Sequence, residues 1–179
     1  MSEPGCGRMI ESFLQAMSRT ANSVCVVTTD GIGGKAGVTV SAMTSVSAEG
    51  PNPSLLICVH GRSRTCEAIQ INRRFCANLL SESQAAISES FAGRTGKTGE
   101  DKFDCAEWTT GATGCPVLVG HLAAFDCRLV HSIKVGSHHI FVGEVLDVDV
   151  AASGRPLIHH ARAYAAARPL EGTGGKGDD

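Results

Sequence analysis

The stretch "GVTVSAMTSVS", from Gly37 to Ser47, carries five hydroxyl side chains on an otherwise apolar frame. Successive side chains of a β-strand point to opposite faces. Read as one strand, the stretch has an apolar face of Val38, Val40, Ala42, Thr44 and Val46. The other face carries Thr39, Ser41, Met43, Ser45 and Ser47. No long charged side chain is present, so the hydroxyl face suits a ligand that approaches the backbone. A strand that is merely rich in Ser and Thr is the alternative, because Thr favours strands.

Length and charge limit the classes of protein that this chain can belong to. Its 179 residues are enough for one domain with a proper core, and 42% of them are hydrophobic. The net charge of −2 provides no general attraction to nucleic acid or to an anionic membrane. No apolar run approaches the roughly 20 residues of a membrane-spanning helix, and the N-terminus lacks a signal core. We therefore expect a cytoplasmic protein with one domain over residues 1–170 and a disordered, glycine-rich tail over 171–179.

The eight cysteines do not form a metal-binding pattern. No two of them are closer than eight residues, so the sequence has no C-x-x-C unit. Cys25, Cys58, Cys76 and Cys127 lie in apolar, strand-like runs, where cysteine behaves as a small hydrophobic residue. We expect reduced, buried thiols and no metal site.

Hydrophobic periodicity predicts a mainly β protein with flanking helices. Apolar residues at helical spacing predict an N-terminal helix over about 8–20, and similar patterns predict helices over 63–73 and 81–93. Strands are predicted over 23–29, 36–47, 54–60, 74–81 and 138–150, and the segment 115–136 is predicted to form two strands or one long bent strand. In the last of these, Ile140, Val142, Leu146, Val148 and Val150 are expected to share a face. Residues 93–103 read as a mobile loop. Six or seven strands with three helices favour a closed or partly closed antiparallel barrel.

Two glycine motifs resemble nucleotide-binding loops but lack the required context. "GIGGKA" (31–36) matches a dinucleotide fingerprint, yet the β-branched run after it predicts a strand rather than a helix. "GKT" (96–98) lacks the earlier glycine of a phosphate-binding loop, because Phe91 stands there. The paired histidines 138–139 and 159–160 do not form two-ligand metal clamps, since neighbours on a strand face opposite ways. The sequence also lacks a recognisable nucleophile or carboxylate pair.

An ordered set of short segments carries a family resemblance. In sequence order, the segments are "VVTT", "GVTVSAMTSVS", "LLICV", "SRT", "FCANLLSESQAAISESFAG", "DKF", "GCPVLVGHLAAFDCRL", "GSHHIFVGEV" and "PLIHHARAY". From about Met17 to Tyr164, the chain resembles the short-chain NAD(P)H:flavin oxidoreductases, the reductase components of two-component flavin-dependent monooxygenases. The resemblance implies a flavin-binding split β-barrel and a homodimer.

The resemblance also implies which residues bind the nucleotides. Flavin contacts are expected from Thr39, Val40, Ser41, Ala42, Ser45, Val46 and Ser47. A helix start at Ser63, Arg64 and Thr65 would add an anion site, or is simply a capped helix. Further residues beside the flavin would be Asn78, Leu79, Leu80, Ser81, Gln84, Phe91, Ala92 and Lys102, the last of which also reads as a solvated loop charge. His139, Arg162 and Tyr164 are expected on the nicotinamide side, with His138 on the opposite strand face.

The implied activity is hydride transfer from NADH, or NADPH, to FAD or FMN as an exchangeable substrate. Because the two nucleotides carry this chemistry, no acid–base residue is required and none is predicted. Reduced flavin would then supply a partner monooxygenase that acts on an aromatic compound. Two alternatives remain: a flavin- or haem-binding split-barrel module without turnover, and an enzyme similar to pyridoxamine-phosphate oxidase.

Overall fold

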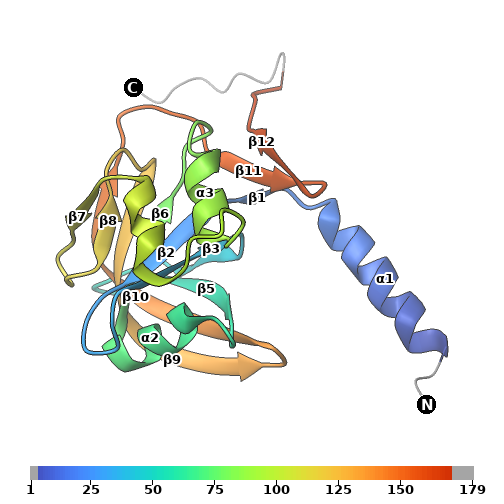
Figure 1. Ribbon diagram of the computed structural model, residues 1–179, viewed down its shortest axis with the longest axis horizontal. Helices are drawn as coiled ribbons and strands as arrows, with labels where there is room; N and C mark the ends of the chain where they lie inside the picture. Colours follow the sequence, from blue (N-terminus) through green and yellow to red (C-terminus); the bar gives the residue numbers. More distant parts are fainter. Residues whose placement is uncertain (1–3, 171–179) are drawn as a thin grey trace.

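The computed structural model describes residues 4–170, and over this range the chain forms three α-helices, one 3-10 helix and twelve strands (Figure 1). The helices are α1 (Pro4–Ser18), α2 (Arg64–Asn72), α3 (Ala85–Phe91) and the 3-10 helix η1 (Gly99–Cys105). The first six strands are β1 (Asn22–Ser23), β2 (Cys25–Thr29), β3 (Ala36–Val40), β4 (Met43–Ser47), β5 (Ser54–His60) and β6 (Arg74–Leu79). The others are β7 (Trp108–Thr110), β8 (Pro116–Leu118), β9 (Ala123–Val135), β10 (His138–Val150), β11 (Leu157–His160) and β12 (Ala163–Ala166). The predicted tail, 171–179, lies outside the described residues.

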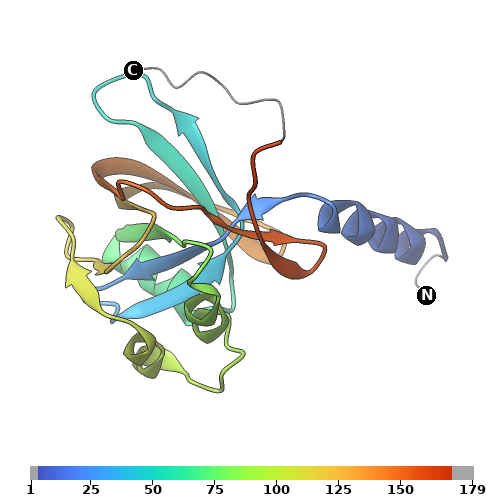
Figure 2. The same ribbon diagram turned by 90° about the horizontal axis from the view of Figure 1, so that it is seen from above.

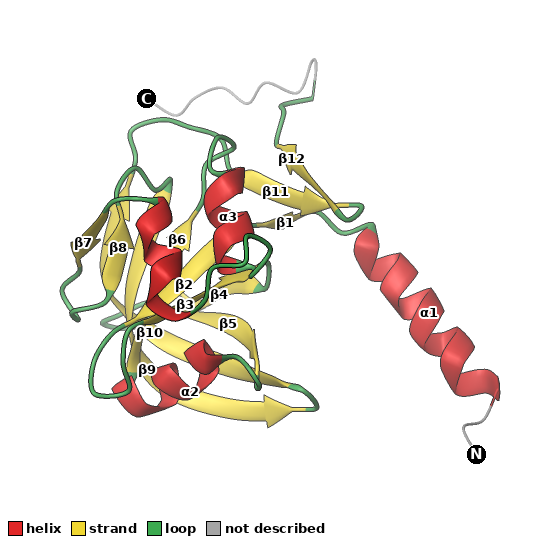
Figure 3. Ribbon diagram, viewed as in Figure 1, coloured by secondary structure: helices red, strands yellow, loops and turns green. Residues whose placement is uncertain are grey.

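The main sheet curls into a split β-barrel. Seven antiparallel strands follow the order β3-β2-β6-β9-β10-β5-β4. The two edge strands, β3 and β4, are consecutive in the chain and are separated only by Ser41 and Ala42. The sheet must therefore bend round until its edges approach each other, and Figure 3 shows the strands wrapped in this way. This confirms the predicted mainly β fold with flanking helices.

One apolar core fills the barrel and a second lies outside it. The inner core includes Val27, Ile57, Phe75 and Phe141, all fully buried, and α2 adds Ile69. The outer core lies beneath α3 and η1. Strand β2 is buried on both faces because its side chains alternate between the two cores.

The outer core brings α3 and η1 against β3. Phe91 of α3 packs edge to face with Phe103 of η1, with ring centroids 5.0 Å apart, and Trp108 completes the aromatic cluster. A Cβ atom at Gly37 would lie 2.5 Å from the Phe91 ring, so only glycine permits this close approach. This packing fixes the position of the helices beside the strand.

The stretch 37–47 does not form one continuous strand, and the expected alternation was wrong beyond Val40. The chain bends at Ser41 and Ala42 between β3 and β4. After the bend, Met43 packs against the inner core, whereas Val46 is 53% exposed. The bend shifts the strand phase, and it does so where the chain leaves one sheet edge for the other.

The predicted apolar face of 138–150 was also wrong. Phe141 and Val145 are the core residues of β10, whereas Leu146, Val148 and Val150 are exposed. Register shifts between Val142 and Gly143 and between Val145 and Asp147 interrupt the alternation. Other boundaries moved less: α1 starts and ends earlier than 8–20, α3 is shorter than 81–93, and η1 occupies the end of the predicted loop.

Helix α1 projects away from the barrel (Figure 2). Its apolar positions, Met9, Ile10, Phe13, Leu14 and Met17, are 48–70% exposed. None of the described helices is both long and apolar enough to cross a bilayer.

Candidate functional site

Three hollows meet along β3. The first, of about 190 Å³, is lined by the end of β3, by α3 and by the β11–β12 hairpin; we name it the tyrosine hollow after Tyr164. The second, of about 320 Å³, shares Thr39, Val40 and Ser41 with the first and extends to Ala42, Cys58 and two histidines; we name it the histidine hollow. The third, of about 70 Å³, lies at the start of β3; we name it the basic hollow. The hydroxyl-bearing β3 therefore borders all three.

The basic hollow combines anion-binding groups from two segments. Ser63, Arg64 and Thr65 lie at the start of α2, where Ser63 Oγ accepts a hydrogen bond from Thr65 N at 3.2 Å and caps the helix. Lys102 faces them from η1, and its Nζ donates to Phe91 O at 3.3 Å. The positive end of the α2 helix dipole and two cations favour a phosphate group. Burial lowers the pKa of the Lys102 ammonium.

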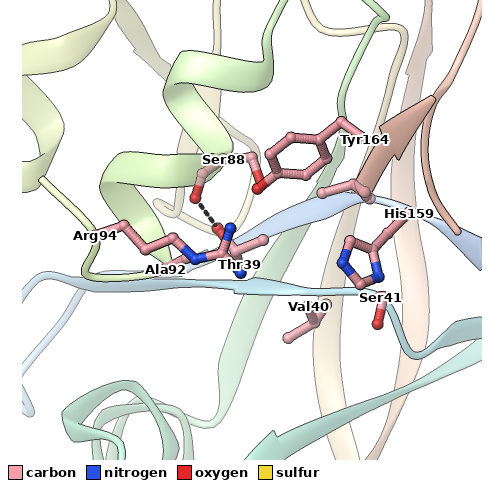
Figure 4. Close-up of a pocket in the computed structure, with 9 residues that line it drawn as sticks. Thr39, Val40, Ser41, Ser88, Ala92, Arg94, His159 and Tyr164 are labelled. Atoms are coloured by element: carbon pink, nitrogen blue, oxygen red, sulfur yellow. Dashed lines mark hydrogen bonds between the residues drawn. The ribbon is translucent and has the colours of Figure 1, made fainter. Parts of the chain in front are cut away.

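The tyrosine hollow joins β3 to the C-terminal hairpin. Thr39 Oγ1 donates to Ser88 O at 2.7 Å, and Ser88 Oγ is hydrogen-bonded to Tyr164 Oη at 2.8 Å (Figure 4). The Tyr164 ring meets the His159 ring edge to face at 6.0 Å. Arg94 adds a cation to the lining and is paired with Glu89 at 2.8 Å. Burial raises the pKa of Tyr164, partly offset by the Ser88 hydrogen bond.

The histidine hollow contains His60 and His138, whose ring centroids are 5.0 Å apart. His138 shares this hollow with β3, whereas His139, which was expected on the nicotinamide side, lines neither the histidine hollow nor the tyrosine hollow. His139 lines a neighbouring hollow of about 300 Å³ with Arg62 and Lys134, which shares only His60 with the histidine hollow. The Nδ1 atom of His139 lies 3.2 Å from Ser132 Oγ. Strand alternation separated the two rings as predicted, but the sequence pattern did not show which ring faces β3.

The structure also separates β4 from the three hollows. Ser45 and Ser47 line a mainly apolar hollow of about 160 Å³ with Met43 and Phe125, and none of its lining residues belongs to the other three. Ser47 Oγ accepts from Glu49 N at 3.1 Å. The bend at Ser41 and Ala42 sends β4 to the other sheet edge, which removes these serines from β3.

Several other predicted residues hold the framework around the site. Asn78 is fully buried; it donates to Val26 O and Thr28 Oγ1 and accepts from Leu118 N. Leu80 and Phe91 are buried in the outer core, and Leu79 packs against the inner one. Gln84 bridges Ser81 N and Gly120 O. None of these side chains is among the residues that line the three hollows.

The C-terminal residues differ in their placement. Tyr164 and Ala92 line the tyrosine hollow, whereas Arg162 is exposed in the β11–β12 turn with a φ of 63°. Sequence reasoning missed Ser88, Arg94, His159, His60 and His138 as lining residues. The sequence pattern predicted the helix α3, but nothing in the sequence showed that the β11–β12 hairpin folds back onto this helix.

Comparisons with known proteins identify the family of this chain. Residues 17–168 match the family described as "Flavin reductase like domain". The chain is 40% identical to the FMN reductase (NADH) RutF of Ancylobacter novellus over 154 residues, which cover 86% of this chain and 83% of that protein.

Two solved structures extend the comparison. A protein of Haemophilus somnus 129PT assigned as a flavin reductase superposes with a TM-score of 0.82 at 34% identity, covering 88% of this chain and 99% of that one. BorF, the flavin reductase component of a bacterial two-component tryptophan halogenase, superposes with a TM-score of 0.80 at 28% identity, covering 90% and 99%. With the family matched over most of its length and the split barrel in common, this chain belongs to the flavin reductase-like domain family.

Proposed function

We propose that this protein is an NADH-dependent flavin reductase that takes FMN or FAD as an exchangeable substrate. The observation that carries the proposal is the arrangement of the three hollows along β3. A basic hollow of phosphate character stands at one end of the strand, and two larger hollows share its other end. Relatives named FMN reductase (NADH) support the choice of both nucleotides.

The basic hollow suits the phosphate end of the flavin. Arg64 and Lys102 supply charge, and the start of α2 adds the positive end of the helix dipole. Both FMN and FAD carry a phosphate at the ribityl end, so both fit this assignment. Riboflavin lacks the phosphate and should bind more weakly.

The histidine hollow and the tyrosine hollow suit the two reacting rings. We assign the flavin ring to the histidine hollow, where the backbone from Val40 to Ala42 and the His138 ring are available. We assign the nicotinamide to the tyrosine hollow, with Tyr164 and His159 as its walls. The shared residues Thr39, Val40 and Ser41 bring the two rings together. Bound flavin supplies the hydride acceptor, and the side chains only orient the nucleotides and exclude water.

Exposed apolar surface supports a homodimer. Val46, Ile133, Val135, Leu146, Val148 and Val150 are all at least 44% exposed on β4, β9 and β10, and α1 presents its own uncovered apolar side. This much exposed apolar surface is typical of an interaction site. A second copy of the chain is the partner that the family resemblance predicts.

Reduced flavin would leave this protein for a reduced-flavin-dependent monooxygenase. The halogenase-associated reductase BorF supports a two-component system of this general kind. An aromatic substrate for the oxygenase and a cytoplasmic location stay predictions from the sequence.

The decisive experiment follows NADH oxidation by the purified protein with FMN, FAD, riboflavin or no added flavin. We expect oxidation only with flavin, and a lower KM for FMN than for riboflavin. A parallel series with NADPH reports the coenzyme preference. Absence of oxidation with all three flavins would contradict the reductase assignment and favour a binding module. Pyridoxamine phosphate as an added substrate tests the remaining alternative.

A further inference from the structure

Ser88 occupies a central position in the lining of the tyrosine hollow. It is fully buried on α3, yet both its polar oxygens bind other elements. Its backbone oxygen accepts from Thr39 of β3 at 2.7 Å, and its hydroxyl is bonded to Tyr164 of β12 at 2.8 Å. A single serine thus links the strand assigned to the flavin with the hairpin assigned to the nicotinamide (Figure 4).

The β11–β12 hairpin needs such a link. Its turn places Ala161 and Arg162 in the left-handed region, with φ values of 50° and 63°. Two-residue turns of this kind strongly prefer Gly, Asn or Asp, so the local sequence does not favour this turn. Of the residues in β12, Ala163 and Ala165 are exposed, and Tyr164 packs against the outer core. The tyrosine is therefore the main side-chain anchor of the strand.

We propose that Ser88 is a positioning residue for the nicotinamide side of the site, acting through Tyr164. This inference rests on the proposed function. By holding the phenol, Ser88 fixes the angle at which the Tyr164 and His159 rings wall the hollow. Although Ser88 lines the hollow, its side chain is fully buried and its hydroxyl is bonded to Tyr164, so we expect it to act on the nucleotide through the phenol. Its loss should therefore affect the capture of NADH, and should affect neither flavin capture nor the rate of hydride transfer in the bound complex.

A double-mutant cycle on Ser88→Ala and Tyr164→Phe tests this link. With saturating FMN, each single variant should raise the KM for NADH by about three- to tenfold, as expected for one hydrogen bond. The maximal rate should stay within about twofold of the wild-type value. The double variant should match the single variants, because both remove the same bond. Tyr164 is half-buried, so Tyr164→Phe keeps the test available if Ser88→Ala folds poorly.

Ser90→Ala is the matched control. Ser90 is also buried on α3, but its hydroxyl lies 3.5 Å from Lys102 O and is not bonded to Tyr164. It should leave the KM for NADH unchanged. An equal rise in Ser90→Ala, additive effects in the cycle, or a defect confined to the KM for FMN would each overturn the positioning role.

An ultraviolet titration of Tyr164 tests the contact with Ser88 independently of whether the protein oxidises NADH. Tyr164 is the sole tyrosine of the chain, so ultraviolet titration follows its phenol alone. Burial raises the pKa of this phenol above its usual value, the Ser88 hydrogen bond lowers it, Glu89 raises it and Arg94 lowers it. Ser88→Ala should shift the titration to higher pH even if the protein oxidises no NADH. An unshifted titration would refute the contact; an inactive wild type with a shifted titration would refute only the reductase assignment.

Discussion

Lys102 is the cation of the basic hollow whose charge depends most on its surroundings. Burial disfavours its ammonium form, so it loses its proton at a lower pH than an ordinary lysine with a pKa of 10.5. The attraction between Lys102 and a flavin phosphate is therefore present at neutral pH and lost as the pH rises through this lowered value.

We predict that the KM for FMN rises between neutral pH and about pH 10, while the KM for riboflavin changes much less over the same range. Lys102→Arg should move the rise to higher pH, because a guanidinium stays charged. Steady-state kinetics at a series of pH values measures both effects. The same pH dependence for FMN and riboflavin would show that Lys102 does not contact the phosphate.

The adjacent histidines His138 and His139 of β10 allow a matched comparison of two neighbouring side chains. We predict that His138→Ala raises the KM for FMN by about two- to tenfold, through loss of one ring contact or hydrogen bond. His139→Ala should change it by less, because His139 lines the other hollow with Arg62 and Lys134. Separate titrations of flavin and NADH on both variants decide the assignment. A larger FMN defect in His139→Ala would contradict the assignment of His138 to the flavin ring. The expectation from the sequence, that His139 contacts NADH, predicts instead a rise in the KM for NADH in that variant.

Among the elements, the β11–β12 hairpin carries the clearest conformational strain. An L-residue in the left-handed region costs about 1–2 kcal/mol, and glycine avoids this cost while adding entropy to the unfolded chain. Ala161 has no side-chain function in the turn, although its N–H donates to Ser18 O at 2.8 Å, which glycine retains.

Ala161→Gly should therefore stabilise the protein by roughly 0.5–1 kcal/mol and raise Tm by a few degrees. Ala165→Gly is the control within the same hairpin. Ala165 lies in extended β12, opposite Ile158, so glycine there should lower Tm. Thermal denaturation followed by circular dichroism compares the two variants. A loss of stability in Ala161→Gly would mean that the turn is not strained in solution.

At the scale of the whole molecule, the uncovered side of α1 calls for a partner surface. A 15-residue helix is marginally stable alone in water, and here its apolar side chains are exposed. A second copy of the chain would cover them and stabilise the helix.

We predict a species of twice the chain mass of 18.6 kDa in sedimentation experiments. Phe13→Glu should raise the dissociation constant of the dimer by roughly tenfold or more, since burying a phenylalanine contributes about 1.5–3 kcal/mol. Gln15→Glu adds the same charge to the same helix at a polar position and should leave the mass unchanged. A monomeric wild type would contradict the homodimer; equal dissociation in both variants would place α1 outside the interface.

The sequence by itself determined most of the secondary structure. Strand 54–60 and the Ser63-capped helix depend on local alternation and local hydrogen bonds, and both were predicted at nearly their observed bounds. The split barrel and the family followed from the order of many short segments. Even single-residue details such as the capping hydroxyl of Ser63 were accessible, because the groups involved are neighbours in the chain.

The tertiary structure decided how these elements meet. A two-residue bend changed the phase of Met43 and carried Ser45 and Ser47 away from β3, and register shifts changed the buried face of β10. Whether His138 or His139 faces β3 depends on the pairing of β10 with β5. The link from Thr39 through Ser88 to Tyr164 joins residues 49 and 76 positions apart. Such contacts depend on packing between distant elements, and local periodicity carries no information about which distant side chain will lie opposite.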